Sequence, residues 1–163
     1  MQTKAFCGEV EVHFSGGSYQ LMKNWLGEQL KYRGQKGVSL GERLYNALRE
    51  AFAENKGKVV IIGTDCPGLT LKHIEQAFNL LDRFNLVIGP AHDGGYYLIG
   101  LTKAVKDLFS GIKWGSAFVY RQTLEAAQKA NLSIAELEKL QDVDCPSDLS
   151  FLTTVKNSIY SNN

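Results

Sequence analysis

The spacing of apolar residues divides the chain into short strands and amphipathic helices. Residues 9–14 alternate between polar and apolar side chains, which predicts a strand with one solvent-facing side. Two other runs, 59–63 and 86–90, are apolar almost throughout, and a third such run covers residues 96–101. Continuous apolar strands are typical of sheets that are covered on both faces. The pattern therefore predicts a sheet with helices packed against both sides.

Helical spacing fills most of the stretches between these strands. Apolar residues recur every three or four positions in the segments 19–30, 40–52, 70–81, 104–109 and 116–130. Ser39 and Glu42 form a capping-box pattern at the start of the second of these segments. Residues 32–38, rich in Gly and Lys, indicate a loop. A strand is predicted near residues 134–140, and a last helix begins at Pro146.

Alternating strands and helices with short connections indicate an α/β fold in which residues 1–163 form a single domain. The 163 residues suffice for one domain with a real core and are too few for two comfortable ones. Hydrophobic residues make up 44% of the chain and charged residues 21%, as in ordinary globular proteins.

The charge pattern excludes several classes of partner. The net charge is only +1 and the cations are not clustered, so neither a nucleic-acid partner nor a membrane surface is expected. No apolar run approaches the roughly 20 residues of a bilayer span, and no secretory leader opens the sequence, so we expect a cytoplasmic protein. Three cysteines without close pairs indicate neither a disulfide framework nor a Cys-x-x-Cys metal site.

Two Asp-Cys-Pro triplets supply the first candidate site. Asp65 follows the apolar strand 59–63, Asp144 follows the strand expected near 134–140, and each precedes a proline. In open α/β sheets, ligands bind beyond the carboxyl ends of the strands, where these two carboxylates could meet. Such an oxygen-rich pair suits Mg²⁺ or Mn²⁺. The alternative is that each aspartate merely stabilises a helix N-terminus through the helix dipole.

The segment His-Asp-Gly-Gly-Tyr-Tyr is the second candidate. Gly94 and Gly95 permit a ligand to approach the backbone closely, and Asp93 could receive a hydroxyl group. A tight hairpin turn explains Asp-Gly equally well. Tyr96 and Tyr97 could stack on a sugar or a base, although neighbouring strand residues face opposite sides, so at least one belongs to the core.

These motifs, taken together over residues 37–149, resemble a bacterial group of glycosyltransferase-like proteins with the GT-A fold, known as selenodomain-associated transferases. The resemblance depends on the stretches GERLYNALREAF, VVIIGTDCPGLT, LVIGPAHDGGYYLIGL and DVDCPSDL, which occur in the family's order. The group is similar in fold to the molybdenum-cofactor and phospholactate guanylyltransferases. The resemblance implies a three-layer α/β sandwich with a mostly parallel sheet, as in nucleotide-diphospho-sugar transferases.

The resemblance also implies roles for the candidate residues. It places Asp65 at the metal- and nucleotide-binding aspartate of such folds, and Asp144 at a second ligand of a divalent cation, Mg²⁺ or Mn²⁺. The donor would be a nucleotide-sugar or a nucleotide, and the acceptor a small molecule of unknown identity.

The central loop and a segment near residue 114 complete this set. Asp93, as catalytic residue, with Gly94 and Gly95 falls at the acceptor or sugar loop. Trp114 and Ser116 lie in a substrate-binding segment that usually contains Trp-Ser-Thr, where this chain has Trp-Gly-Ser. Tyr96 is expected to contact the nucleotide donor.

The chain departs from the group at its front. Members normally begin with a strand followed by a basic Lys/Pro/Gly-rich loop that cradles the nucleotide, and then a helix. Here the first strand, 9–14, corresponds to the family's second strand, so the fold is expected to be N-terminally shortened. In the GT-A order the absent strand lies inside the sheet, and its loss would leave backbone groups without partners.

Three functional hypotheses follow. The first is metal-dependent glycosyl transfer from a nucleotide-diphospho-sugar, in which the cation stabilises charge on the leaving group. The second keeps the fold but transfers a nucleotidyl group and releases pyrophosphate. The third is a catalytically silent, shortened domain that associates with a partner or forms a homodimer through its uncovered sheet edge.

Overall fold

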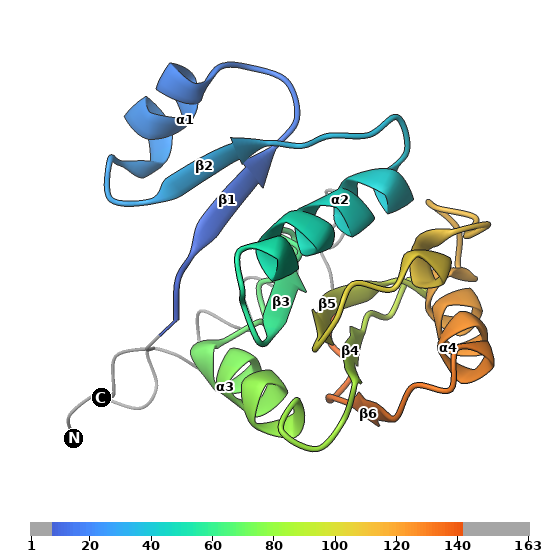
Figure 1. Ribbon diagram of the computed structural model, residues 1–163. Coiled ribbons are helices and arrows are strands. Elements are labelled where there is room, and N and C mark those ends of the chain that lie inside the picture. Colours follow the sequence, from blue (N-terminus) through green and yellow to red (C-terminus); the bar gives the residue numbers. More distant parts are fainter. Residues whose placement is uncertain (1–7, 142–163) are drawn as a thin grey trace.

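The computed structural model describes residues 8–141, and Figure 1 shows their arrangement. The elements follow the alternating pattern predicted from the sequence. In chain order they are β1 (Glu11–Phe14), α1 (Tyr19–Leu26), β2 (Lys31–Gly34), α2 (Leu40–Ala53), β3 (Val59–Ile62), α3 (Leu71–Leu80), β4 (Leu86–Pro90), β5 (Tyr96–Leu101), the 3₁₀ helix η1 (Lys106–Phe109), α4 (Val119–Lys129) and β6 (Ile134–Glu136). The helix expected at Pro146 lies outside the described residues.

The main sheet has four strands in the order β3-β5-β4-β6. Strand β5 is antiparallel to both of its neighbours, whereas β4 and β6 are parallel. Strands β3, β4 and β6 therefore run in one direction and β5 alone runs against them. The predicted α/β class is confirmed, and most strands share a direction as expected, although the reversed β5 makes two of the three pairings antiparallel.

Helices cover both faces of this sheet, which gives the three predicted layers (Figure 1). On one face, Leu48 of α2, Leu108 of η1 and Ala127 of α4 pack against alternate residues of β4 and β5. On the other face, Ala77 of α3 packs against Val87 and its neighbours. The side chains of Leu48, Leu86, Ile88, Leu98, Ile99, Leu101 and Leu108 are fully buried. The core thus lies on both faces of β4 and β5.

Strands β1 and β2 form a separate parallel pair that sits beside α2. Ion pairs connect this pair to the helix, with Lys36 Nζ 2.8 Å from Glu50 Oε1 and Arg33 Nη2 2.6 Å from Glu54 Oε1. The sequence predicted a loop over residues 32–38, which is wrong for the first three of these residues. Backbone pairing with β1 and burial of Tyr32 make this charged, glycine-ended segment a strand.

The residues of β3 are less buried than the sequence predicted. Its apolar sequence predicted a strand covered on both faces, yet Ile62 is 41% exposed and the other residues of β3 are half-buried. Within residues 8–141, β3 pairs with β5 alone and β1 with β2 alone. The strands β1 and β3 therefore each have one edge without a described neighbour.

Helix α1 is shorter than predicted and leaves its apolar side open. It ends at Leu26 because Gly27 follows with φ of +94°, so the expected continuation to Leu30 is wrong. Trp25 is 76% exposed, and no residue of α1 is buried. Among the helices of the described region, none combines the length and the apolar character that a bilayer crossing requires.

Candidate functional site

The candidate residues gather at the end of the sheet where β3 and β4 finish and β5 begins. Because β5 is antiparallel, its first residues lie beside the last residues of its neighbours. The backbone N–H of Gly63 donates to the carbonyl of Tyr97 over 2.9 Å, which ties the chain after β3 to the start of β5. The N-terminus of α2, which runs back towards the start of β3, lies at this end too (Figure 1).

Asp65 is exposed in the loop that follows β3. Its carboxylate folds back over Gly63, since a Cβ on that glycine would lie 2.7 Å from Oδ1 of Asp65. The next residue, Cys66, is buried, and its thiol donates to the carbonyl of Gln141 over 3.5 Å. The Asp65 carboxylate therefore faces solvent while its neighbour anchors the loop.

The Asp93 loop is a hairpin connection between β4 and β5, which confirms the turn interpretation of Asp-Gly. Oδ1 of Asp93 accepts from the backbone N–H of Gly95 over 2.7 Å. Gly94 has φ of +91°, and its carbonyl accepts from the N–H of Tyr120 over 2.9 Å. A Cβ on Gly94 would lie 2.3 Å from the carbonyl oxygen of Ala117. The turn is thus fixed against the segment before α4, with the Asp93 carboxylate exposed.

A β-bulge in β5 lies at Tyr97, directly after Tyr96. Pro90 pairs with Tyr96 and Gly89 with Leu98, so Tyr97 is the extra residue. Tyr97 is 2% exposed on the α3 side, where its hydroxyl donates to the carbonyl of Glu138 over 2.9 Å. Burial raises the pKa of Tyr97 to about 12. The prediction that at least one of the tyrosines belongs to the core is confirmed.

Tyr96 points to the opposite face, towards Trp114. The two rings meet at 78° with centroids 6.4 Å apart. Burial raises the pKa of Tyr96, an effect that the hydroxyl of Thr123 partly opposes. Within the described residues, the hydroxyl oxygens of Tyr96 and Thr123 are both buried, and neither makes a hydrogen bond of good geometry. Tyr96 thus supports the Trp114 ring from the core side.

Trp114 and Ser116 belong to a turn that lies against the N-terminus of α2. A Cβ on Gly41, in the first turn of α2, would lie 2.9 Å from Nε1 of Trp114. The Ser116 hydroxyl donates to the carbonyl of Lys113 over 2.6 Å. Gly115 has φ of +74°, a conformation that favours glycine.

The described residues do not form a metal site by themselves. Within residues 8–141, no group of three or more His, Cys, Asp or Glu side chains could hold a metal ion. Asp144, the predicted second ligand, lies outside the described residues. Asp65 offers one exposed, hard carboxylate, a donor that fits Mg²⁺ or Mn²⁺ ions that retain water and phosphate oxygens as further ligands.

The sequence analysis missed a polar contact behind the Asp65 loop, between a buried histidine and an exposed glutamate. His73 is buried, and its Nε2 lies 2.6 Å from Oε1 of Glu138. Its Nδ1 accepts from the backbone N–H of Thr70 over 3.0 Å, at the start of α3. Thr70 and His73 have the spacing of a capping box. This local pattern could have predicted that the His73 side chain bonds to the backbone at the start of α3.

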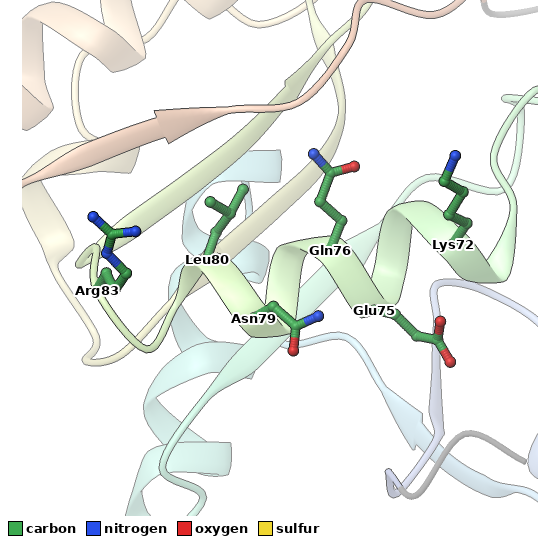
Figure 2. A pocket seen from close by; sticks show the side chains of 6 residues that line it. All are labelled: Lys72, Glu75, Gln76, Asn79, Leu80 and Arg83. Atoms are coloured by element: carbon green, nitrogen blue, oxygen red, sulfur yellow. The ribbon is translucent and has the colours of Figure 1, made fainter. Parts of the chain in front are cut away.

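A surface groove of about 450 Å³ runs along the outer side of α3 (Figure 2). Its lining residues are Lys72, Glu75, Gln76, Asn79, Leu80 and Arg83. They come from α3 and the turn after it, and only Lys72 lies in the first turn of the helix, near the Asp65 loop. The groove therefore does not coincide with the cluster of candidate residues at the strand ends.

Comparison with known proteins assigns the chain to a family. The model of the family described as "Uncharacterized protein conserved in bacteria (DUF2064)" matches residues 1–116. A crystal structure of a "putative nucleotide-diphospho-sugar transferase" from Desulfovibrio desulfuricans G20 superposes with a TM-score of 0.88 at 37% identity. That match covers 95% of this chain and 70% of the other.

Curated relatives are 2-phospho-L-lactate guanylyltransferases from archaea. The protein from Methanocaldococcus jannaschii is 35% identical over 124 residues, which cover 74% of this chain and 54% of the relative. The protein from Methanocaldococcus vulcanius is 31% identical over 65% of this chain and 48% of the relative. The chain thus spans about half the length of these curated relatives.

Proposed function

Because the chain belongs to the bacterial family DUF2064 and shares the fold of the Desulfovibrio desulfuricans structure, we propose that it is a transferase that acts on a nucleotide-activated donor. The donor would bind at the end of the sheet formed by the Asp65 loop, the Asp93 hairpin and the Trp114 turn. The observation that supports this most strongly is the convergence of these three segments at the carboxyl ends of β3 and β4. Crevices at such strand ends are the usual ligand sites of α/β sheets.

Each candidate residue has a role in this proposal. Asp65, exposed after β3, would provide a carboxylate for a divalent cation, Mg²⁺ or Mn²⁺, and Asp144 would provide a second. When bound, the ion would neutralise phosphate charge on the donor. Asp93, fixed by the N–H of Gly95, would orient the hydroxyl of the acceptor. Gly94 and Gly95 form the turn that presents this carboxylate, and Ala117 occupies the space that a Cβ on Gly94 would enter.

The position of Gln141 supports a role for Asp144. Gln141, the last described residue, accepts a hydrogen bond from Cys66, the residue directly after Asp65. The described chain therefore ends beside the Asp65 loop, which supports a shared role for Asp144, three residues further along the sequence.

Nucleotidyl transfer is the reaction that we favour. The curated relatives, at 31–35% identity, are named as guanylyltransferases. In this reaction the acceptor oxygen would bond to the α-phosphorus of a nucleoside triphosphate, and pyrophosphate would leave. Glycosyl transfer, which would release a nucleoside diphosphate, is the second candidate because the Desulfovibrio desulfuricans structure is named as a nucleotide-diphospho-sugar transferase.

Isothermal titration with GTP, CTP, GDP-sugars and UDP-sugars, each with Mn²⁺, tests the proposal. We expect Mn²⁺-dependent binding of at least one of these donors, and its loss in Asp65→Asn. Product analysis then separates the two reactions, since pyrophosphate marks nucleotidyl transfer and a nucleoside diphosphate marks glycosyl transfer. Absence of binding for the whole panel would overturn the proposal.

A role in protein association is the remaining candidate. It is favoured by the half-exposed apolar strand β3, which has a described neighbour on one side only. Such an edge can pair with a strand of a second copy. Sedimentation as a monomer at all concentrations would exclude a homodimer.

A further inference from the structure

Residues 9–36, which we name the lobe, form a small unit around β1, α1 and β2. Tyr32 alone is buried among these residues. Its ring meets that of Tyr19 at 83° with centroids 5.7 Å apart, and its hydroxyl donates to the carbonyl of Gly27 over 2.6 Å. Because both partners belong to the lobe, its one buried side chain packs inside the unit.

The lobe stays outside the core of the main sheet. Neither of the two buried clusters of the described region, nor the apolar side chains packed against them, includes a residue of the lobe. Helix α2 lies between the two parts. Its residue Leu48 is fully buried against the main sheet, whereas Glu50 Oε1 lies 2.8 Å from Lys36 Nζ of the lobe. Helix α2 therefore uses an apolar side for the main sheet and a charged side for the lobe.

Further ion pairs follow the contact between the lobe and α2. Arg33 Nη2 lies 2.6 Å from Oε1 of Glu54, the residue directly after α2. Lys56, two residues further along, pairs with Glu9 at the start of the lobe. Two parts of a chain that meet through a polar contact can move relative to each other, whereas a large apolar contact would hold them fixed.

Arg33 is the centre of this charged contact. Its Nε lies 2.9 Å from Oε2 of Glu11 in β1, and its Nη2 reaches Glu54. A third carboxylate, that of Glu50, has its Oε2 4.0 Å from Nη1. Without the guanidinium group, carboxylates from β1 and α2 would repel each other. One side chain thus joins the lobe to the helix.

We propose that residues 9–36 form a hinged lobe, which Arg33 latches onto α2 and which opens without unfolding of the main sheet. The lobe joins α2 through residues 37–39, where Gly37 has φ of +137°. This linker lies at the end of the sheet where the candidate residues gather (Figure 1). The side chains of Arg33, Glu11 and Glu54 are between 18% and 41% exposed, so salt screens the latch and favours the open lobe. The inference depends on these contacts and is independent of the proposed function.

The test is amide hydrogen exchange of the full chain at about 0.1 M and about 1 M NaCl, where the screening length falls from about 10 Å to about 3 Å. The Gln35 N–H donates to the carbonyl of Phe14 over 2.7 Å and reports on the lobe. The Leu137 N–H donates to the carbonyl of Ile88 over 2.9 Å and reports on the main sheet. Two strands and a helix with one buried side chain are marginally stable alone, so the released lobe loses its own hydrogen bonds.

We expect faster exchange at the Gln35 amide than at the Leu137 amide, and a further rise at high salt for Gln35 only. Equal exchange rates at the two amides would mean that the lobe opens only when the whole protein unfolds, and would overturn the inference. A Gln35 rate that does not respond to salt would overturn the ionic latch.

Substitution of the latch gives a second measurement. Arg33→Gln should raise the exchange rate of the Gln35 amide about tenfold at low salt, since ion pairs to several partly exposed carboxylates are lost together. At high salt the difference from wild type should narrow. Arg121→Gln is the matched control, because the ion pair of Arg121 with Glu125, over 3.7 Å, lies within α4 alone. It should leave Gln35 at the wild-type rate.

A double-mutant cycle identifies the partner of the latch. In a Glu54→Gln background, Arg33→Gln should accelerate exchange at Gln35 less than it does in wild type, because one of its ion pairs is already absent. Equal acceleration in both backgrounds, or wild-type exchange in Arg33→Gln itself, would overturn the inference. An equal acceleration of the Leu137 amide in Arg33→Gln would also overturn it, since the whole protein would then be destabilised.

Discussion

Gly94 and Ala117 lie so close that a Cβ on the glycine would be 2.3 Å from the alanine carbonyl oxygen. This contact joins the hairpin that presents Asp93 to the turn that contains Trp114 and Ser116. The positive φ of Gly94 and the close approach have a common consequence, because a side chain at this position would separate two parts of the candidate site.

We predict that Gly94→Ala lowers the free energy of unfolding by about 3 kcal/mol, through backbone strain and overpacking together. Gly111→Ala is the matched control, since Gly111 also has a positive φ (+72°) but no atom lies within 4 Å of its added Cβ. It should cost about 1 kcal/mol from strain alone. Urea denaturation measures both, and equal losses would show that the contact with Ala117 has no effect.

Gly63 controls where the Asp65 carboxylate rests. A methyl group at residue 63 would lie 2.7 Å from Oδ1 of Asp65, the end of an exposed side chain that can swing away. Gly63→Ala should therefore leave the unfolding free energy within about 1 kcal/mol of wild type while it weakens Mn²⁺-dependent nucleotide binding. Gly57→Ala, with no atom within 4 Å of its Cβ, serves as the control. Unchanged nucleotide binding in Gly63→Ala would argue against the proposed role of the carboxylate.

Asp93 has a structural and a proposed chemical role, and two substitutions separate them. Asp93→Asn retains an oxygen to accept from the N–H of Gly95, so stability should be preserved while transfer activity falls at least tenfold. Asp93→Ala removes the acceptor as well and should also lose about 1 kcal/mol of stability. Thermal unfolding and initial rates measure the two effects. Full activity in Asp93→Asn would mean that the negative charge is not required.

Alkaline pH should destabilise the fold through Tyr97. Its pKa rises from 10.0 to about 12 because of burial, with smaller contributions from Cys66 and Glu138. Below pH 10 the Tyr97 hydroxyl keeps its proton in both the folded and the unfolded protein. Between pH 10 and pH 12 it ionises in the unfolded protein first, so the free energy of unfolding falls as the pH rises. The stability difference between wild type and Tyr97→Phe, measured by denaturation at pH 8 and pH 11, should therefore narrow, and a constant difference would contradict this account.

Periodicity predicted most of the fold, because most elements bury one regular face. It identified the apolar strands β3, β4 and β5 and the helices α2, α3 and α4. It missed β2, since four residues with two charges and a terminal glycine have no strand pattern of their own and depend on pairing with β1. It also overestimated the burial of β3, because the pattern describes what a strand can bury and does not show how many neighbours it has.

The candidate site was predictable where chemistry follows the ends of strands. Asp65 and Asp93 were found from their place after apolar runs, and the structure brings both loops to one end of the sheet. The link between His73 and Glu138 was not predictable, since the two residues lie 65 positions apart and only tertiary packing brings them together. The bulge at Tyr97 was likewise hidden, because it depends on the register between β4 and β5, which the residues of β5 alone do not show.

The central claim is that Asp65 binds a divalent ion together with the phosphates of a nucleotide. Titration of Mn²⁺ by electron paramagnetic resonance, with and without GTP, tests it in wild type, Asp65→Asn and Asp82→Asn. The Asp82→Asn variant is the control, because Asp82 is also an exposed aspartate but lies far from the Asp65 loop. It pairs with Lys58, which directly precedes β3, whereas Asp65 follows the other end of that strand. We predict that GTP strengthens Mn²⁺ binding in wild type and Asp82→Asn, and that Asp65→Asn loses this effect. Equal Mn²⁺ affinities in all three proteins would contradict the account.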